Sequence, residues 1–173
     1  MIYAVFFLIS YFAVRIEQGL TIRIGDKRYK MYLGSLLSVG ILTLLVLARS
    51  MSVGTDTYKY YYSANSNIRT YSSLVQILNG YYIEPAYGIF EWIVMRITGD
   101  VHYIFLVESI VLLSGVFFVL KEFEGKIPRE LGLLVFCTYY FNPSLNISRQ
   151  YIAVGLGLFG CVFLVQNKWG KYI

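Results

Sequence analysis

The sequence predicts an all-α, polytopic membrane protein, built as a bundle of about five spanning helices with one further interfacial or re-entrant helix. Of its 173 residues, 57% are hydrophobic and 14% are charged, whereas soluble domains have about 45–50% apolar and about 25% charged residues. The apolar residues gather in runs close to the roughly 20 residues that a spanning helix needs. The basic residues lie between these runs, which is typical of a topology signal and argues against a nucleic-acid patch.

Five apolar segments are expected to cross the membrane. They are residues 2–14, 32–48, 101–120, 128–141 and 143–165. The first and fourth are short for a hydrocarbon core of about 30 Å, so either the bilayer thins locally or these helices extend into flanking residues. The N-terminus lacks the basic leader of a cleavable signal peptide, and we expect it to be retained as the first span.

A sixth segment, residues 83–97, has apolar residues at helical spacing but also carries Glu84, Glu91 and Arg96. If this segment does not cross, ten of the fifteen Lys and Arg residues lie in short loops on one face, which the positive-inside rule makes cytoplasmic. The sequence therefore predicts an extracytoplasmic N-terminus. It also predicts an extracytoplasmic loop over residues 49–100, in which residues 83–97 form the amphipathic interfacial or re-entrant helix.

Arg49 marks the first candidate site, where the second predicted span ends. Ionisable groups at membrane level are costly and often functional, so Arg49 is either an interface anchor or a ligand for an anion. The following Gly54-Thr55-Asp56-Thr57 is typical of a turn that enters a helix, with Thr55 or Asp56 as its cap. Three roles stay open for Asp56: helix cap, partner of an arginine, or catalytic base.

Arg149 marks the second candidate site, at the head of the last predicted span. Asn142 suits an N-cap and Pro143 the first helical position, so this helix would begin at the outer face, where its N-terminus favours anions. Asn142, Asn146 and Arg149 would then share one helical face. A guanidinium binds phosphate or carboxylate oxygens in pairs, while the alternative is that Arg149 only reaches toward lipid head groups.

Small residues follow on the same predicted face at intervals of four. Ala153, Gly157 and Cys161 predict close packing against a neighbouring helix, which would turn the face of the arginine into the bundle.

Cys161 and Cys137 lie within apolar runs and are expected to be buried fillers rather than a disulfide or metal pair. The single histidine, His102, excludes a multi-histidine metal site. We expect neither a metal nor another cofactor.

Tyrosines crowd the outer segment, Tyr60 and Tyr61 among them. They suit an interfacial aromatic belt and equally a platform for sugar rings, and the sequence does not divide them between these roles.

Three carboxylates also allow two interpretations. Glu84 and Glu91 are seven residues apart on one helical side, as a paired acid/base site would need, or they pair with an arginine such as Arg96 or Arg49. Glu108, inside a predicted span, needs a polar partner or a water path. Residues 121–130 are expected to form a solvated, charged turn.

Three short sequence blocks occur in the order that is typical of one family of membrane proteins. The blocks are Arg49 with Val53-Gly54-Thr55-Asp56-Thr57 and Tyr60 or Tyr61, then Glu84-Pro85-Ala86-Tyr87-Gly88, then Asn146-Ile147-Ser148-Arg149-Gln150. Together they resemble the EpsG family, within the broader group of Wzy-type polysaccharide polymerases. The resemblance covers most of the chain but only the first half of such a protein, so we expect a fragment or half-length chain whose activity on its own is doubtful.

The resemblance implies a membrane glycosyltransferase of the GT-C type in the bacterial cytoplasmic (inner) membrane. Such an enzyme joins undecaprenyl-pyrophosphate-linked oligosaccharide repeat units at the outer face during exopolysaccharide, capsule or O-antigen synthesis. Arg49 and Arg149 would stabilise the pyrophosphate, and Asp56 or Glu84 would orient or deprotonate the acceptor hydroxyl. Substrate-binding roles are assigned to Tyr60, Tyr61, Asn142, Asn146 and Gln150.

Two other functions fit the same features. A transporter or flippase for the lipid-linked glycan would need cationic groups along a whole crossing path, whereas the charges of this sequence cluster at one depth. A non-catalytic membrane subunit of a polysaccharide-assembly complex would tolerate changes to its arginines. The expected partners are the lipid-linked glycan, the bilayer and other polysaccharide-assembly proteins, and not a nucleic acid.

Overall fold

The computed structural model of the protein describes residues 2–24, 27–80 and 84–166. These residues form helices and one short β-hairpin. In chain order the elements are α1 (Ile2–Glu17), β1 (Thr21–Ile24), β2 (Lys27–Lys30), α2 (Leu33–Leu47), α3 (Thr57–Thr70), α4 (Leu74–Asn79), α5 (Pro85–Thr98), α6 (His102–Glu122), α7 (Arg129–Tyr139), α8 (Phe141–Asn146) and α9 (Ser148–Val165).

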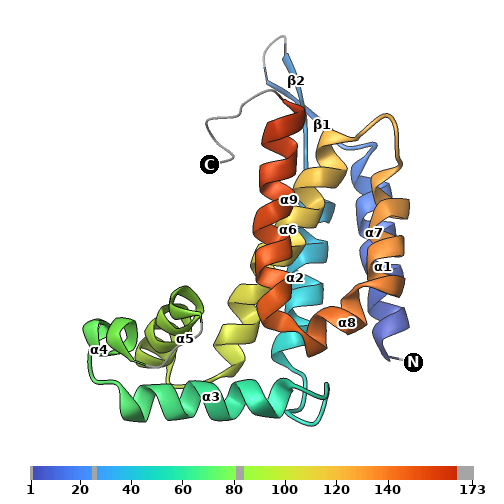
Figure 1. The fold of residues 1–173 in the computed structure, drawn as a ribbon. Coiled ribbons are helices and arrows are strands. Elements are labelled where there is room, and N and C mark those ends of the chain that lie inside the picture. Colours follow the sequence, from blue (N-terminus) through green and yellow to red (C-terminus); the bar gives the residue numbers. More distant parts are fainter. Residues whose placement is uncertain (1, 25–26, 81–83, 167–173) are drawn as a thin grey trace.

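Five of the helices, α1, α2, α6, α7 and α9, run side by side as a bundle (Figure 1). The remaining helices gather at the lower end of this view, where α3 lies across the bundle and α5 packs against α3, α4 and α6. We call this the loop end, and it also carries α8. The opposite end, which carries β1, β2 and residues 123–128, is called the hairpin end. The segment predicted to be interfacial, now α5, therefore lies at one end of the bundle and not among its long helices.

The helical architecture agrees with the prediction from the sequence. Among the described residues, α6 is long and apolar enough to cross a membrane, and shorter apolar helices run over Leu33–Leu47 and Arg149–Val165. The number of spans, their orientation and a likeness to the GT-C architecture stay predictions.

The hairpin adds a small element to the predicted helices. Its strands pair antiparallel, with Thr21 opposite Lys30 and Ile24 opposite Lys27. The sequence predicts only a tight turn here, at Gly25-Asp26-Lys27, and the first two of these residues lie outside the described part of the chain. The first strand, Thr21–Ile24, alternates polar and apolar residues, which is the signal that could have predicted it.

The predicted starting residue of the last span is wrong. In place of one helix from residue 143, the structure has α8, then a break at Ile147 (φ −113°, ψ 47°), then α9. Asn142 and Pro143 lie inside α8, so Asn142 is not the cap of the long helix. A proline is compatible with the first turn of either helix, and the sequence pattern did not distinguish the two. The predicted common face of Asn142, Asn146 and Arg149 is therefore lost.

The packing face of α9 also differs from the prediction. Ala153 and Cys161 are exposed, and a Cβ on Gly157 would meet nothing within 4 Å. The buried position is Gly155, where an added Cβ would lie 2.8 Å from the Cα of Leu112 in α6. Glycine is needed at this point because the two backbones approach too closely for a side chain.

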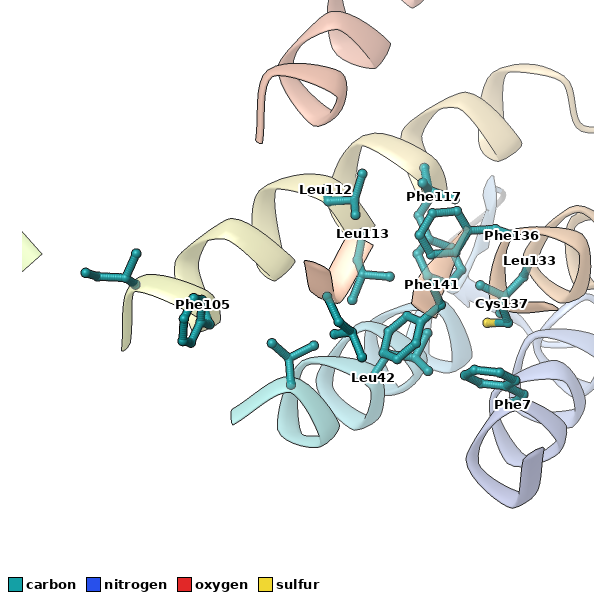
Figure 2. Close-up of a cluster of buried hydrophobic side chains, with 14 of the residues drawn as sticks. Phe7, Leu42, Phe105, Leu112, Leu113, Phe117, Leu133, Phe136, Cys137 and Phe141 are labelled. Carbon is teal, nitrogen blue, oxygen red and sulfur yellow. The ribbon is translucent and has the colours of Figure 1, made fainter. Parts of the chain in front are cut away.

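The hydrophobic core lies between the bundle helices (Figure 2). Leu42 from α2, Leu113 from α6 and Leu133 from α7 are almost completely buried. The rings of Phe7 and Phe141 meet edge to face, with centroids 5.3 Å apart, and so join α1 to α8. Cys137 is buried in this core as a small filler, as predicted.

The hairpin end contains a buried ionic cluster where the sequence predicts a solvated turn. Arg129 and Glu130 are 2% and 1% exposed. Arg129 pairs with Glu17, whose carboxylate also accepts hydrogen bonds from the backbone N–H and hydroxyl of Ser35, at 2.5 and 2.8 Å. Glu130 pairs with Arg15 at 2.6 Å. The prediction of a solvated turn is wrong for Arg129 and Glu130, because their partners lie more than a hundred residues away in sequence. Lys121 and residues 125–128 are exposed, as predicted.

The contact between α6 and α9 predicts that substitution of two glycines of α9 will affect stability to very different extents. Gly155→Leu should destabilise the protein by about 1–3 kcal/mol, because the new side chain collides with the backbone of α6. Gly157→Leu, in open space on the same helix, should leave stability nearly unchanged. Thermal unfolding of the purified protein in detergent measures both. Equal melting temperatures for the two variants would contradict the described packing.

Candidate functional site

The three sequence blocks meet at the loop end, although they come from different parts of the chain. The Arg49 guanidinium donates a hydrogen bond from Nη1 to the carbonyl oxygen of Leu145 at 2.7 Å. The backbone N–H of Thr55 donates to Oδ1 of Asn146 at 3.0 Å. These two bonds fasten the segment after α2 to the end of α8, and so fix where α3 and α9 begin relative to one another.

The turn before α3 depends on a glycine. Gly54 has φ +96°, a region that L side chains rarely adopt. A Cβ at this position would also lie 2.6 Å from Oδ1 of Asn146. The hydroxyl of Thr57 donates back to the carbonyl of Val53 at 2.6 Å and closes the turn. Asp56, one of the two caps that the sequence allows, then occupies the N-cap position of α3, but its side chain makes no capping hydrogen bond.

A polar cavity of about 290 Å³ lies beside this turn, and we call it the Arg149 cavity. It is enclosed by side chains from α3, α5 and the start of α9, together with Asp56. The lining residues are Asp56, Lys59, Tyr60, Ser63, Tyr87, Glu91 and Arg149. Four of the seven are Asp, Glu, Lys or Arg residues, so this cavity suits a polar or charged ligand.

Arg149 is only partly neutralised. Its Nε lies 3.3 Å from Oε2 of Glu84, and both side chains are nearly half exposed, at 41% and 47%. Its guanidinium also lies 5.9 Å from the centre of the Tyr87 ring. An ion pair this exposed contributes little stability, about 0–1 kcal/mol, so an anionic ligand can replace Glu84 as the partner of Arg149. The arginine partner of Glu84 is thus Arg149, and not Arg96 or Arg49 as the sequence suggested.

The second cation of the cavity is Lys59. Its Nζ lies 2.7 Å from Oδ1 of Asp56, with the lysine side chain 79% and the aspartate 33% exposed. The hydrogen bond to Asp56 raises the pKa of Lys59. Asp56 is therefore held by a lysine at the rim of the cavity.

A buried carboxylate forms another wall. Glu91 is completely buried, and its Oε2 accepts hydrogen bonds from Asn67 Nδ2 at 2.9 Å and from Ser63 Oγ at 3.4 Å. These donors belong to α3, while Glu91 belongs to α5, so the carboxylate joins the two helices that frame the cavity. Buried charged groups persist only with such partners.

Arg49 does not line the Arg149 cavity. It is 5% exposed, and its guanidinium stacks 4.1 Å above the ring of Phe105. It borders a separate cavity of about 20 Å³, shared with Glu108, with room for about one water molecule. Within the described residues, its Nε and Nη2 have no hydrogen-bond partner. Burial lowers the pKa of Arg49, and the nearby Glu108 opposes that shift.

The two arginines therefore border different cavities and do not share the single anion pocket that the sequence predicts. A hydrogen bond crosses the wall between them. The hydroxyl of Tyr87, from the Arg149 cavity, donates to Oε1 of Glu108, from the Arg49 cavity, at 2.8 Å. Burial, followed by the charge of Glu108, raises the pKa of Tyr87, so this phenol stays a neutral donor.

The structure separates the other predicted site residues by environment. Tyr60 lines the Arg149 cavity, and burial raises its pKa. Tyr61, one residue on, is 38% exposed and stacks on Tyr58 at the outside of α3, with ring centroids 6.4 Å apart. Asn142 and Gln150 are exposed and border neither cavity.

Sequence reasoning missed several of the cavity residues. Two of them are Lys59 and Ser63, which line the cavity. They lie four residues apart along α3 and so share a face with Asn67, the donor to Glu91, and this helical spacing is the signal that could have grouped them. The sequence suggests an acid/base pair or an arginine partner for Glu91, whereas the structure gives it donors from Asn67 and Ser63. Among the described residues, there is no cluster of three or more His, Cys, Asp or Glu side chains that could hold a metal ion.

The two asparagines of the third block offer a test of this geometry. Asn146→Ala should lower the free energy of unfolding by about 1 kcal/mol, because the backbone N–H of Thr55 loses its acceptor. Asn142→Ala, at an exposed position of the same short helix, should have almost no effect. Thermal or denaturant unfolding of the purified variants makes the comparison, and a larger effect at Asn142 would refute the described fastening of the turn.

Among curated proteins and solved structures, none matches this chain. The EpsG family profile matches residues 32–173, a range that includes α2 to α9 and all three blocks. The resemblance predicted from those blocks is thereby confirmed. Together with the apolar helices, it indicates a membrane protein with a role like that of a polysaccharide polymerase. The chain belongs to the EpsG family, a family of proteins like the Wzy-type polysaccharide polymerases.

Proposed function

We propose that the protein is a membrane glycosyltransferase-like polymerase. It joins undecaprenyl-pyrophosphate-linked oligosaccharide repeat units at the outer face of the bacterial cytoplasmic membrane, in exopolysaccharide, capsule or O-antigen synthesis. The observation that carries the proposal is the Arg149 cavity, where two cations, two carboxylates and two tyrosines from three helices and a turn surround one space.

The chemistry requires a stabilised leaving group. A hydroxyl oxygen of the acceptor sugar bonds to the anomeric carbon of the donor, and the bond from that carbon to the pyrophosphate oxygen breaks. Negative charge grows on the pyrophosphate, so positive groups held beside it lower the barrier. Arg149 is suited to this role by its paired donors, its weakly held partner Glu84, and its place in the first turn of α9. The helix dipole there favours anions.

The acceptor hydroxyl must lose its proton. Asp56 and Glu84 are the two carboxylates that the sequence suggested for this step. Asp56 borders the cavity, whereas Glu84 is not among the lining residues and forms an exposed ion pair with Arg149. We therefore assign proton acceptance to Asp56, with Lys59 holding it in place at 2.7 Å.

Tyr60 and Tyr87 supply aromatic surface beside these charges, suited to the apolar face of a sugar ring. Ligand pockets usually measure about 300–1,000 Å³, so the cavity of about 290 Å³ suits the reacting groups and not a whole repeat unit. In this scheme Arg49 does not contact the reacting groups. It is a positioning residue, which holds the carbonyl of Leu145 and borders the small cavity shared with Glu108.

The transporter alternative needs a polar path through the bundle. The charges do not all cluster at one depth, because the hairpin end holds the buried Glu17–Arg129 pair. Between the two ends, however, most buried side chains are apolar, with Leu42, Leu113 and Leu133 almost fully buried. The buried polar side chains there, Ser10, Ser38 and Thr43, are uncharged. The charged groups therefore form two separate regions and not a continuous path through the bundle, which favours the polymerase over the transporter.

Substitution of Arg149 in the chromosomal gene tests the polymerase. Arg149→Lys keeps the charge but loses the paired donors, and loss of such a contact costs about a hundred- to a thousandfold in rate. We expect long polysaccharide to disappear while the membrane level of the protein stays normal. Arg96→Lys is the matched control, because Arg96 stacks 5.1 Å from the Trp92 ring in α5 outside the cavity. Normal polymer length from Arg149→Lys would refute the proposed role.

The orientation is tested by labelling single cysteines. In a background with Cys137→Ala and Cys161→Ala, Ser66→Cys places an exposed thiol on α3. We expect it to react with a membrane-impermeant thiol reagent in intact cells, because the loop end is proposed to face outward. Lys126→Cys at the hairpin end should react only after lysis. The reverse pattern would overturn the orientation.

A further inference from the structure

A second cavity lies at the hairpin end, at the opposite end of the bundle from the Arg149 cavity. It measures about 310 Å³ and is enclosed by residues of α2, α6, α7 and α9 together with Tyr32. Its apolar walls include Leu36, Val39, Phe118 and Phe159. Lys121 also borders it, and we call it the Lys121 cavity. Leu36 is 68% exposed, so this apolar space opens toward the outside of the bundle.

Two cations flank a single ring at one side of this cavity. Lys121 Nζ lies 4.4 Å and the Arg129 guanidinium 5.1 Å from the centre of the Tyr32 ring. Each cation is attracted to the ring, but the two like charges repel one another. An anion bound beside them relieves that repulsion.

The two cations differ in how far they are already neutralised. The Arg129 side chain is 2% exposed and pairs with Glu17, and its Nη2 lies 3.5 Å from Glu124. Its Nε is buried without a hydrogen-bond partner among the described residues. Lys121 is exposed, and no described acidic residue forms an ion pair with it. Lys121 therefore supplies the uncompensated charge, and Arg129 an unused donor beside it.

We propose that the Lys121 cavity binds an anionic phospholipid from the membrane leaflet next to the hairpin end. The headgroup phosphate lies against Lys121 and the Nε of Arg129, and an acyl chain lies along Leu36, Val39, Phe118 and Phe159. Basic pockets between membrane helices are known to hold acidic headgroups. A free phosphate or sugar phosphate would leave the apolar walls unused. This inference requires that the bundle is in a membrane, but it is independent of the polymerase chemistry.

Lipid titration of the purified protein in an uncharged detergent tests the proposal. Phosphatidylglycerol and phosphatidylcholine with identical acyl chains are compared by native mass spectrometry, and inorganic phosphate is added as a competitor. The protein should bind phosphatidylglycerol more tightly than phosphatidylcholine, and millimolar phosphate should not displace it. Equal binding of the two lipids, or displacement by phosphate, would overturn the proposal.

Lys121→Gln should weaken phosphatidylglycerol binding about fivefold, the effect expected of one lysine near an acidic lipid, and should leave phosphatidylcholine unchanged. Lys126→Gln is the matched control, since Lys126 lies 5.8 Å from the ring of Phe123 in the neighbouring turn and does not line the cavity. Equal losses in the two variants would mean that only general surface charge attracts the lipid.

A third variant tests the acyl site without altering charge. Ser114→Leu adds bulk to the wall formed by α6 and should reduce phosphatidylglycerol binding in a protein with an unchanged circular dichroism spectrum. Full binding by this variant would exclude the cavity as the place of the acyl chain. None of these measurements uses polymer formation, so their failure and that of the polymerase proposal are distinguishable.

Discussion

The segment that follows α2 is hydrogen-bonded to the end of α8, and this contact positions the whole loop end. Arg49 reaches the carbonyl of Leu145, and Asn146 receives the backbone N–H of Thr55. Because α3 starts directly after this segment and α9 directly after α8, the contact brings together helices that are remote in sequence. The Arg149 cavity exists only while both helices keep these starting points. A few polar contacts at the end of an apolar bundle thus determine the geometry of the candidate site.

The sequence predicted the helical bundle well because long apolar runs and the distribution of basic residues are strong signals. It also identified segments that the structure brings together. The prediction from the sequence failed where the same residues were compatible with two local structures. Pro143 fits the start of one long helix or the interior of a short one, and the small residues of α9 offer several possible faces. Only the neighbouring helix decides between them, and it selects Gly155 over Gly157.

Partner choice was the other limit of the sequence. The sequence suggested Arg96 or Arg49 as partners of Glu84, and the fold selects Arg149. Glu17 and Arg129 meet across 112 residues, a separation at which no spacing rule applies, so Arg129 and Glu130 at the start of α7 were mistaken for part of a solvated turn. Tyr60 and Tyr61 differ only in which side of α3 they occupy. In each case the residue type was informative, while its environment depended on tertiary contacts.

The hydroxyl of Tyr87 has a consequence for how rigid the loop end can be. The Tyr87 ring lies beneath the guanidinium of Arg149, and its hydroxyl donates to the carboxylate of Glu108, which borders the small cavity at Arg49. Turning this ring to admit a bulkier molecule would deprive a buried carboxylate of a donor, at a cost of about 1–3 kcal/mol. The position of the Tyr87 ring beneath Arg149 is therefore held by a polar anchor and not by packing alone.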